Sequence, residues 1–215
     1  MDNDELQQRV RDELFWDAKL DSAEIAVSAN NGVITLKGTV GSLPQKREAK
    51  KAAERVYGVL SVKDELAVRI LTGDRHEDAD LRGRVLQALM LNSLVPSTID
   101  AQAKHGVVTL TGSANWQYQR EEAYTTASNV TGVAEVIDQV RLEVMPKAAD
   151  VQSSIKKALE RNADVDADDL TIETHNGSVS ISGTVGSWGE HDEVIAAAWS
   201  APGVTSIDDL MVVRY

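Results

Sequence analysis

The eleven residues Gly32–Ser42, GVITLKGTVGS, decide the fold of this 215-residue chain. Apolar and polar residues alternate along them, which predicts a β-strand with one buried face. The pair Asn31-Gly32 at its start tolerates positive φ and is typical of a tight hairpin turn. Related strings, GVVTLTGSANW and GSVSISGTVGS, begin at Gly106 and Gly177. We therefore expect three repeats of one structural unit.

Nine glycines fix how the three repeats align. Each set of three recurs 74 residues further on and then another 71, without a gap inside any repeat. The nine are Gly32, Gly38 and Gly58; Gly106, Gly112 and Gly132; and Gly177, Gly183 and Gly203. We assign a structural role to all of them. A side chain at Gly38 is expected to meet a packed helix, and Gly58 is expected to end a helix as its C-cap.

Each repeat is predicted to fold as helix, strand, strand, helix, strand. Leu6, Val10 and Leu14 lie four residues apart, which places them on one face of a first helix. A second helix, with alanines on its inward face, follows Ser-x-x-Gln or Ser-x-x-Glu capping signals that begin at Ser42 and Ser187. A third strand with alternating apolar residues closes the unit.

The predicted fold class is α+β. We expect three tandem αββαβ sandwiches over residues 1–71, 77–145 and 148–215. In each sandwich, two helices cover one face of a three-stranded mixed sheet. Because aromatic residues make up only 4% of the chain, the cores must be built from Val, Ile, Leu and Ala.

Composition and charge argue against several function classes. The chain has no cysteine, which removes disulfides, thiol nucleophiles and thiolate-bound zinc. Net charge falls from −1 over residues 1–73 to −3 over 74–147 and −8 over 148–215, so no nucleic acid partner is expected. The N-terminus lacks a signal-peptide pattern, and no stretch has the length of a transmembrane segment. We therefore expect a cytoplasmic protein with no transmembrane segment.

The residues predict no catalytic constellation, so we expect neither an enzyme nor a cofactor. The histidines occupy different positions of the repeat and are interpreted as ordinary surface residues; they are His76, His105, His175 and His191. An acidic run supplies the weak metal candidates Asp164, Asp166, Asp168 and Asp169. This run lacks the glycine and glutamate of an EF-hand loop, so an acidic connection is the simpler interpretation and weak divalent binding the alternative.

Tryptophans and one basic helix are the candidates for a partner or lipid surface. Trp116 and Trp188 lie at strand-to-helix corners, and Trp16 lies near the end of the first helix. Packing is the alternative interpretation of these side chains. The second helix of the first repeat carries the basic residues Lys46, Arg47, Lys50 and Lys51. An ordinary solvated face is the alternative for that helix.

The pattern G-V-x-T-L-x-G-x-V, an alanine-rich helix and then G-V-x-x-V-x-x-x-L-x-V resembles the BON domain, the bacterial module of OsmY-like and DolP-like proteins. The resemblance covers about residues 4–70, 78–144 and 149–213. The strings WQYQR at 116–120 and AAWSAPGV at 197–204 resemble the three-copy branch that lacks a signal peptide. The resemblance implies a role in osmotic or envelope stress, with phospholipid or potassium binding in some members.

Two binding hypotheses follow. The first is a non-enzymatic, stress-associated protein that binds a small ion, potassium or another, or a partner protein. The second is peripheral association with anionic phospholipid membranes. The acidic third repeat argues against the second hypothesis, whereas the nearly neutral first repeat leaves room for it.

Overall fold

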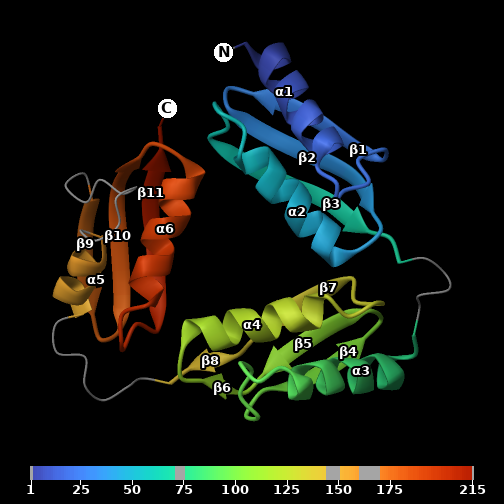
Figure 1. Ribbon diagram of the computed structural model, residues 1–215, viewed down its shortest axis with the longest axis vertical. Helices are drawn as coiled ribbons and strands as arrows, with labels where there is room; N and C mark the ends of the chain where they lie inside the picture. Colours follow the sequence, from blue (N-terminus) through green and yellow to red (C-terminus); the bar gives the residue numbers. More distant parts are fainter. Residues whose placement is uncertain (1, 71–75, 144–150, 160–169, 215) are drawn as a thin grey trace. The chain divides into compact units, whose positions relative to one another are not determined.

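The first repeat has the predicted order of elements. The computed structural model describes residues 2–70, 76–143, 151–159 and 170–214. The elements of the first repeat are α1 (Asn3–Trp16), β1 (Ile25–Asn30), β2 (Val33–Val40), α2 (Leu43–Glu54) and β3 (Ser61–Val68) (Figure 1). Strand β2 lies in the centre of the sheet, antiparallel to β1 and parallel to β3. The sheet is therefore mixed, as predicted.

The second repeat follows the same order, with a sheet that is divided at Gly112. Its elements are α3 (Asp78–Leu91), β4 (Asp100–Lys104), β5 (Val107–Thr111), β6 (Ser113–Ala114), α4 (Gln117–Ser128), β7 (Glu135–Asp138) and β8 (Arg141–Leu142). Strand β5 pairs with β4 and β7, and β6 pairs with β8. Backbone bonds from Gln139 N to Leu110 O (2.9 Å) and from Glu143 N to Ala114 O (2.9 Å) extend the strand pairing by one residue in each part.

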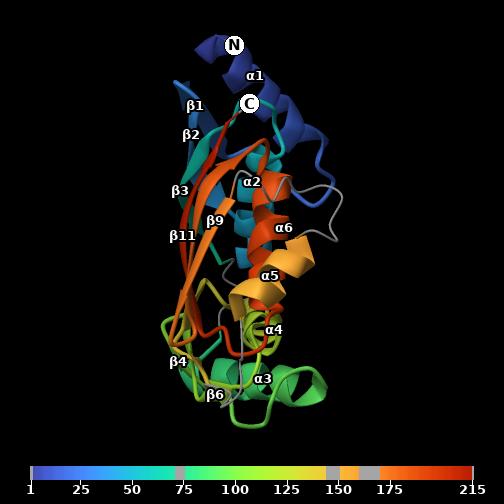
Figure 2. The same ribbon diagram turned by 90° about the vertical axis from the view of Figure 1, so that its left-hand side faces the viewer.

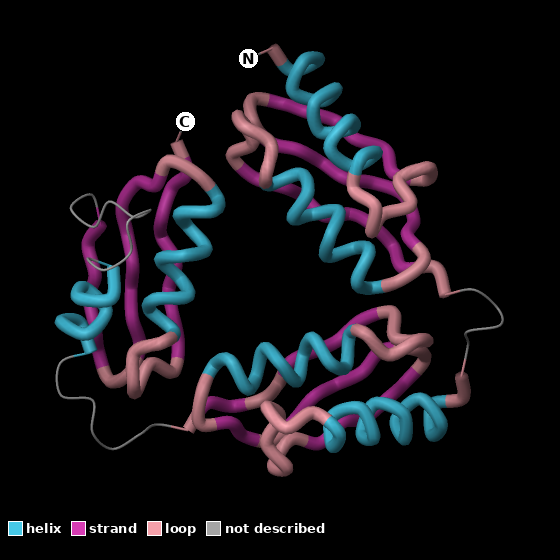
Figure 3. The backbone as a smooth tube through the Cα atoms, viewed as in Figure 1, coloured by secondary structure: helices cyan, strands magenta, loops and turns pink. Residues whose placement is uncertain are grey.

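The third repeat completes the series and confirms the α+β class. Its elements are α5 (Val151–Leu159), β9 (Leu170–His175), β10 (Ser178–Val185), α6 (Trp188–Trp199) and β11 (Ser206–Val213). Figure 2 shows α5 and α6 on the same face of the β9–β10–β11 sheet. The helix pair and three-stranded sheet of each repeat can also be followed along the backbone in Figure 3.

Each core lies between the helix pair and the sheet. Leu6, Val10 and Leu14 of α1 are each 3% exposed or less, which confirms the predicted face. On α2, Ala49, Ala52 and Ala53 are fully buried. These small side chains let α2 pack closely against the other residues of the first core.

The hairpin turns require left-handed backbone at two consecutive positions. Asn31 has φ 48° and Gly32 has φ 80°, and the equivalent pairs in the other repeats agree within a few degrees. This is the type I′ geometry that matches the twist of the flanking strands. In the second repeat His105 takes the asparagine position with φ 52°.

The capping signals are confirmed in the first and third repeats. The Ser42 hydroxyl accepts a hydrogen bond from Gln45 N at 3.4 Å, and the Ser187 hydroxyl accepts one from Glu190 N at 3.1 Å. The return bonds reach one residue further back, since Gln45 accepts from Gly41 N at 3.0 Å. These reciprocal bonds satisfy N–H groups that have no partner inside the helix.

Two expectations about glycines were wrong in their mechanism. The backbone at Gly38 has φ 127°, and a Cβ there would lie 1.9 Å from the carbonyl oxygen of Glu24, not against a helix. Gly58 does not cap α2, because the helix ends at Glu54 with Arg55 as its C-cap. Instead Gly58, with φ 94°, lies in the following turn, which is closed by a bond from Val59 N to Val56 O at 3.1 Å.

Candidate binding surface

The C-terminal end of α1 presents two large aromatic side chains to solvent. Phe15 is 70% exposed and Trp16 is 80% exposed, whereas the preceding Leu14 is 1% exposed. The two rings meet edge to face, with centroids 5.5 Å apart. Trp16, predicted as a surface candidate, therefore lies in an accessible aromatic pair.

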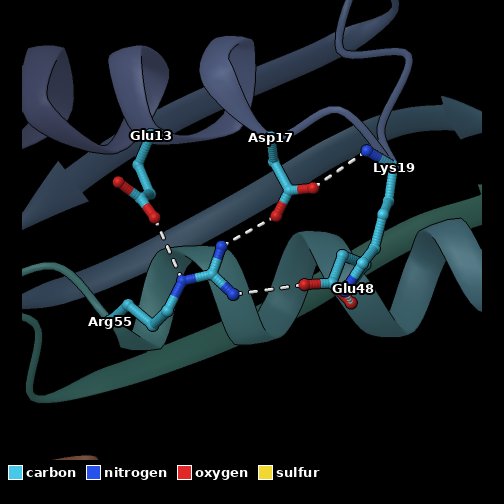
Figure 4. Close-up of polar contacts among 5 residues, drawn as sticks. All are labelled: Glu13, Asp17, Lys19, Glu48 and Arg55. Carbon is cyan, nitrogen blue, oxygen red and sulfur yellow. Dashed lines mark hydrogen bonds and ion pairs between the residues drawn. The ribbon is translucent and has the colours of Figure 1, made fainter.

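An ionic cluster holds this helix end against α2 (Figure 4). Arg55 donates from Nε to Glu13 at 3.0 Å, from Nη2 to Asp17 at 2.7 Å and from Nη1 to Glu48 at 3.1 Å. Lys19 adds an ion pair with Glu48 at 3.5 Å. Because Glu13 and Asp17 come from the last turn of α1 and its C-cap, the guanidinium fixes where the aromatic pair lies.

Asp17 is held in its charged form by two donors. The backbone N–H of Lys19 donates to its carboxylate at 3.0 Å, and Arg55 pairs with the other oxygen. These bonds lower the pKa of Asp17 below its ordinary value of 3.8, and the backbone bond from Lys19 has the largest effect. The surrounding carboxylates, Asp17 first, raise the pKa of Arg55 above its ordinary value.

Replacing Arg55 by alanine is expected to raise the pKa of Asp17 part of the way to its ordinary value, because the Lys19 N–H bond remains. The folded pKa is the lower one, so the stability that Asp17 contributes is present above its unfolded pKa and is lost as pH falls through the folded pKa. Carboxyl-detected NMR titration measures this shift. The matched control is Arg9→Ala, which breaks an exposed 2.8 Å pair with Glu5 on the same helix and should leave Asp17 unchanged. An Asp17 titration that Arg55→Ala does not move would contradict the assignment.

The second repeat presents apolar side chains at the same position. Met90 and Leu91, which end α3, are 79% and 75% exposed, and the nearby Leu94 is 52% exposed. In the alignment of the repeats, Leu14 corresponds to Leu89, so Met90 and Leu91 take the places of Phe15 and Trp16. We call Phe15-Trp16 and Met90-Leu91 the helix-end pairs.

The second helix-end pair is also anchored to its neighbouring helix. Asn92, which corresponds to Asp17, donates from Nδ2 to Glu122 at 2.8 Å and to Thr126 at 2.9 Å. Its side-chain oxygen accepts a bond from Leu94 N at 3.0 Å, as Asp17 does from Lys19 N. Different chemistry thus holds the same backbone feature in both repeats.

The third repeat has no such pair in its sequence. After Leu159, the residue that corresponds to Leu14, the chain continues with Glu160 and Arg161. Both residues lie outside the described part of the chain. The three helix ends therefore read LFW, LML and LER, and the Glu-Arg of the third repeat can be introduced into the other two as a test.

The other two predicted tryptophans lie in less exposed places. Trp116, immediately before α4, is half-buried. Trp188 is the first residue of α6, is half-buried, and packs with Trp199 against the core of the third repeat. Neither lies in a solvent-exposed pair like that of α1.

The predicted basic residues of α2 differ in their surroundings. Lys46 donates to the carbonyl of Leu66 in β3 at 2.6 Å, and Arg47 is half-buried. Lys50 and Lys51 are exposed, and Lys50 forms an ion pair with Glu54 at 3.5 Å. The structure therefore does not bring the four basic side chains together on one exposed face.

Metal-ligating side chains give no further site among the described residues. The weak metal candidates Asp164, Asp166, Asp168 and Asp169 lie outside that part of the chain. Within it, no group of three or more histidine, aspartate or glutamate side chains is arranged to hold a metal ion. No helix in the described ranges has both the length and the apolar character needed to cross a membrane.

Three repeats of a helix pair on one face of a three-stranded mixed sheet define a tandem α+β protein with several small cores. The BON domain model matches residues 2–70, 77–143 and 147–215, and the chain belongs to this family. It is 31% identical to osmotically-inducible protein Y of Escherichia coli K12 over 150 residues, which are 66% of this chain and 73% of that protein.

A second protein is similar in sequence, and one solved structure was matched at low sequence identity. A 21 kDa hemolysin of Actinobacillus pleuropneumoniae is 30% identical over 141 residues, 64% of this chain and 72% of that protein. The solved structure is of CdsD, a structural protein of the type III secretion system of Chlamydia trachomatis. The match covers 98% of this chain and 92% of the CdsD chain. Its sequence identity is 14% and its TM-score is 0.27.

Proposed function

We propose that this protein is a stress-associated binding protein that acts without catalysis, through its helix-end pairs. The similarity to a protein named for osmotic induction supports the stress role. The observation that carries the binding role is the exposure of Phe15-Trp16 and Met90-Leu91 at one position of two repeats. A single exposed apolar residue is ordinary, but anchored pairs that recur are typical of contact surfaces.

The charges around the first pair favour a protein partner over a lipid surface. Asp12 is exposed on the last part of α1, and the ionic cluster beside the pair holds three carboxylates against the two cations Arg55 and Lys19. Carboxylates at this position oppose approach to an anionic bilayer. They favour an apolar segment of a partner protein whose rim is basic, because complementary charge speeds and orients association. We therefore assign the helix-end pairs to partner-protein binding.

The third repeat supplies the substitutions that test this proposal. Phe15→Glu/Trp16→Arg and Met90→Glu/Leu91→Arg introduce the Glu-Arg sequence of the third repeat at equivalent, exposed positions. We expect unchanged circular dichroism and thermal unfolding, because these side chains contribute little to the cores. Photo-crosslinking in extracts of osmotically stressed cells should give partner adducts with the unchanged protein. The yield of these adducts should fall at least roughly tenfold in the variant with both double substitutions, which is the loss typical of hot-spot residues.

The control variant is Leu210→Glu, which alters a 55% exposed apolar side chain on β11 of the third repeat. Its adducts should match those of the unchanged protein. Equal adducts from the helix-end variant and the unchanged protein would reject the proposal.

Two further measurements separate the alternative ligands. Co-sedimentation with phosphatidylglycerol vesicles at low salt is expected to leave the protein in the supernatant; pelleting that depends on Phe15 and Trp16 would replace the protein partner by anionic lipid. Thermal unfolding in matched potassium and sodium chloride is expected to coincide. Stabilisation by potassium alone would favour an ion as the ligand, since a ligand that binds only the folded state raises its stability.

A further inference from the structure

The second helix of every repeat carries a basic residue at one repeat position, and the third strand carries an aspartate at another. The pairs of equivalent positions are Lys46 and Asp64, Arg120 and Asp138, and His191 and Asp209. Each aspartate is oriented in the same way, because its carboxylate accepts the backbone N–H two residues further on, at 3.0, 3.0 and 3.1 Å in the three repeats. The aspartate is thus a common acceptor, whereas the basic residue differs.

The contacts in the first and third repeats show the consequence of this difference. In the first repeat, Lys46 Nζ lies 3.7 Å from the Asp64 carboxylate and 2.6 Å from the Leu66 carbonyl oxygen. In the third, His191 Nε2 lies 2.7 Å from the Asp209 carboxylate and joins α6 to β11. The His191 side chain is only 12% exposed, so this contact is partly shielded from water. Partial burial strengthens the attraction between opposite charges.

The charged groups around His191 are acidic. Asp209 reaches it from β11, and on α6 itself Asp192 lies 3.3 Å from Nδ1. Glu190 precedes it, with its carboxylate bonded to Gly186 N. Strand β10 has no charged residue, and the lysines of α5, Lys156 and Lys157, are exposed.

The start of α6 itself opposes a positive charge through the helix dipole. That effect is smaller than the attraction of a carboxylate at hydrogen-bond distance.

We propose that the His191–Asp209 contact is a pH-sensitive latch between α6 and β11 that protonation tightens. Lysine and arginine stay charged at all physiological pH values, whereas histidine changes charge between about pH 5 and pH 8. The first and second repeats therefore keep a permanent cation at this position, and the third responds to acidification. Neutral His191 still donates one hydrogen bond to Asp209, so loss of the proton loosens the latch without opening it. This proposal does not depend on the helix-end pairs.

Hydrogen–deuterium exchange of the full chain tests the latch, with rates corrected for the intrinsic effect of pH. Amides of α6 and β11 should be protected roughly two- to fivefold more at about pH 6 than at about pH 8, the range for one partly exposed ion pair. Amides of α2 and β3 in the same sample are the internal reference and should show no such change. His191→Lys should protect α6 and β11 equally at both pH values. His191→Gln should give the weaker protection at both.

The reverse substitution keeps the test independent of damage to the third repeat. Lys46→His should transfer pH-dependent protection to α2 and β3. Quenching of the part of the tryptophan fluorescence that Trp188→Phe removes gives a second readout, since the ring centroid of Trp188 lies 4.9 Å from that of His191. The proposal is overturned if the unchanged protein shows the same pH dependence in its first and third repeats. It is also overturned if His191→Lys retains the pH dependence.

Discussion

Gly38→Ala is expected to lower the free energy of unfolding of the first repeat by about 3 kcal/mol or more, among the largest effects of a single methyl group. The backbone at Gly38 has φ 127°, a region that side-chain-bearing residues rarely occupy. The added Cβ would also lie 1.9 Å from the carbonyl oxygen of Glu24. Since that carbonyl accepts a bond from Thr39 N, relief of the clash must disrupt the pairing of β1 with β2.

Exchange mass spectrometry resolves this effect by repeat, because peptides from β1 and β2 report on the first repeat alone. Gly112→Ala should have the same effect in the second repeat, where the added atom would lie 2.1 Å from the Thr98 carbonyl oxygen. The matched control is Gly83→Ala within α3, which meets nothing within 4 Å. That change should stabilise the second repeat by about 0.5–1 kcal/mol, since alanine favours helix. If the β1 and β2 peptides were equally protected in Gly38→Ala and in Gly83→Ala, this prediction would be contradicted.

The repeat architecture could be predicted because two periodicities and the glycine spacing agree. Residues such as Leu6 and Ile34 are buried where the helical and strand patterns place them. The partner of Gly38 could not be predicted in the same way. Its neighbour is a backbone carbonyl across the hairpin, and side-chain patterns carry no information about backbone carbonyls. For the same reason Gly58 was assigned to a helix end, although α2 ends at Glu54, four residues before Gly58.

Part of the candidate surface could be predicted from the sequence. Trp16 was identified as a single aromatic residue, but Phe15, Met90 and Leu91 were not. The three strings at the end of the first helix, LFW, LML and LER, could have revealed them. In LFW and LML, two more apolar residues follow the buried leucine, and they do not lie on the inward face of the helix. The role of Arg55 depends on two helices meeting, since its partners Glu13 and Asp17 lie about forty residues earlier. Only the tertiary structure brings those charges together.

Ala53→Leu is expected to destabilise the first repeat by about 1–3 kcal/mol, because overpacking forces side chains and backbone to shift. Ala53 is fully buried in the first core, and so are the equivalent Ala127 and Ala198 in the other repeats. A leucine in any of these places would push the second helix away from the sheet. We expect each substitution to reduce exchange protection in its own repeat.

The exposed neighbour of Ala53 on α2 separates overpacking from a general effect of leucine. Lys51→Leu adds the same side chain to the same helix on its solvent face, where leucine and lysine have similar helix propensities. Its effect on unfolding should stay within about 0.5 kcal/mol. If Ala53→Leu were as mild as Lys51→Leu, the alanine face would not set the distance between α2 and the sheet. The small residue at this position in every repeat would then reflect helix propensity instead of close packing.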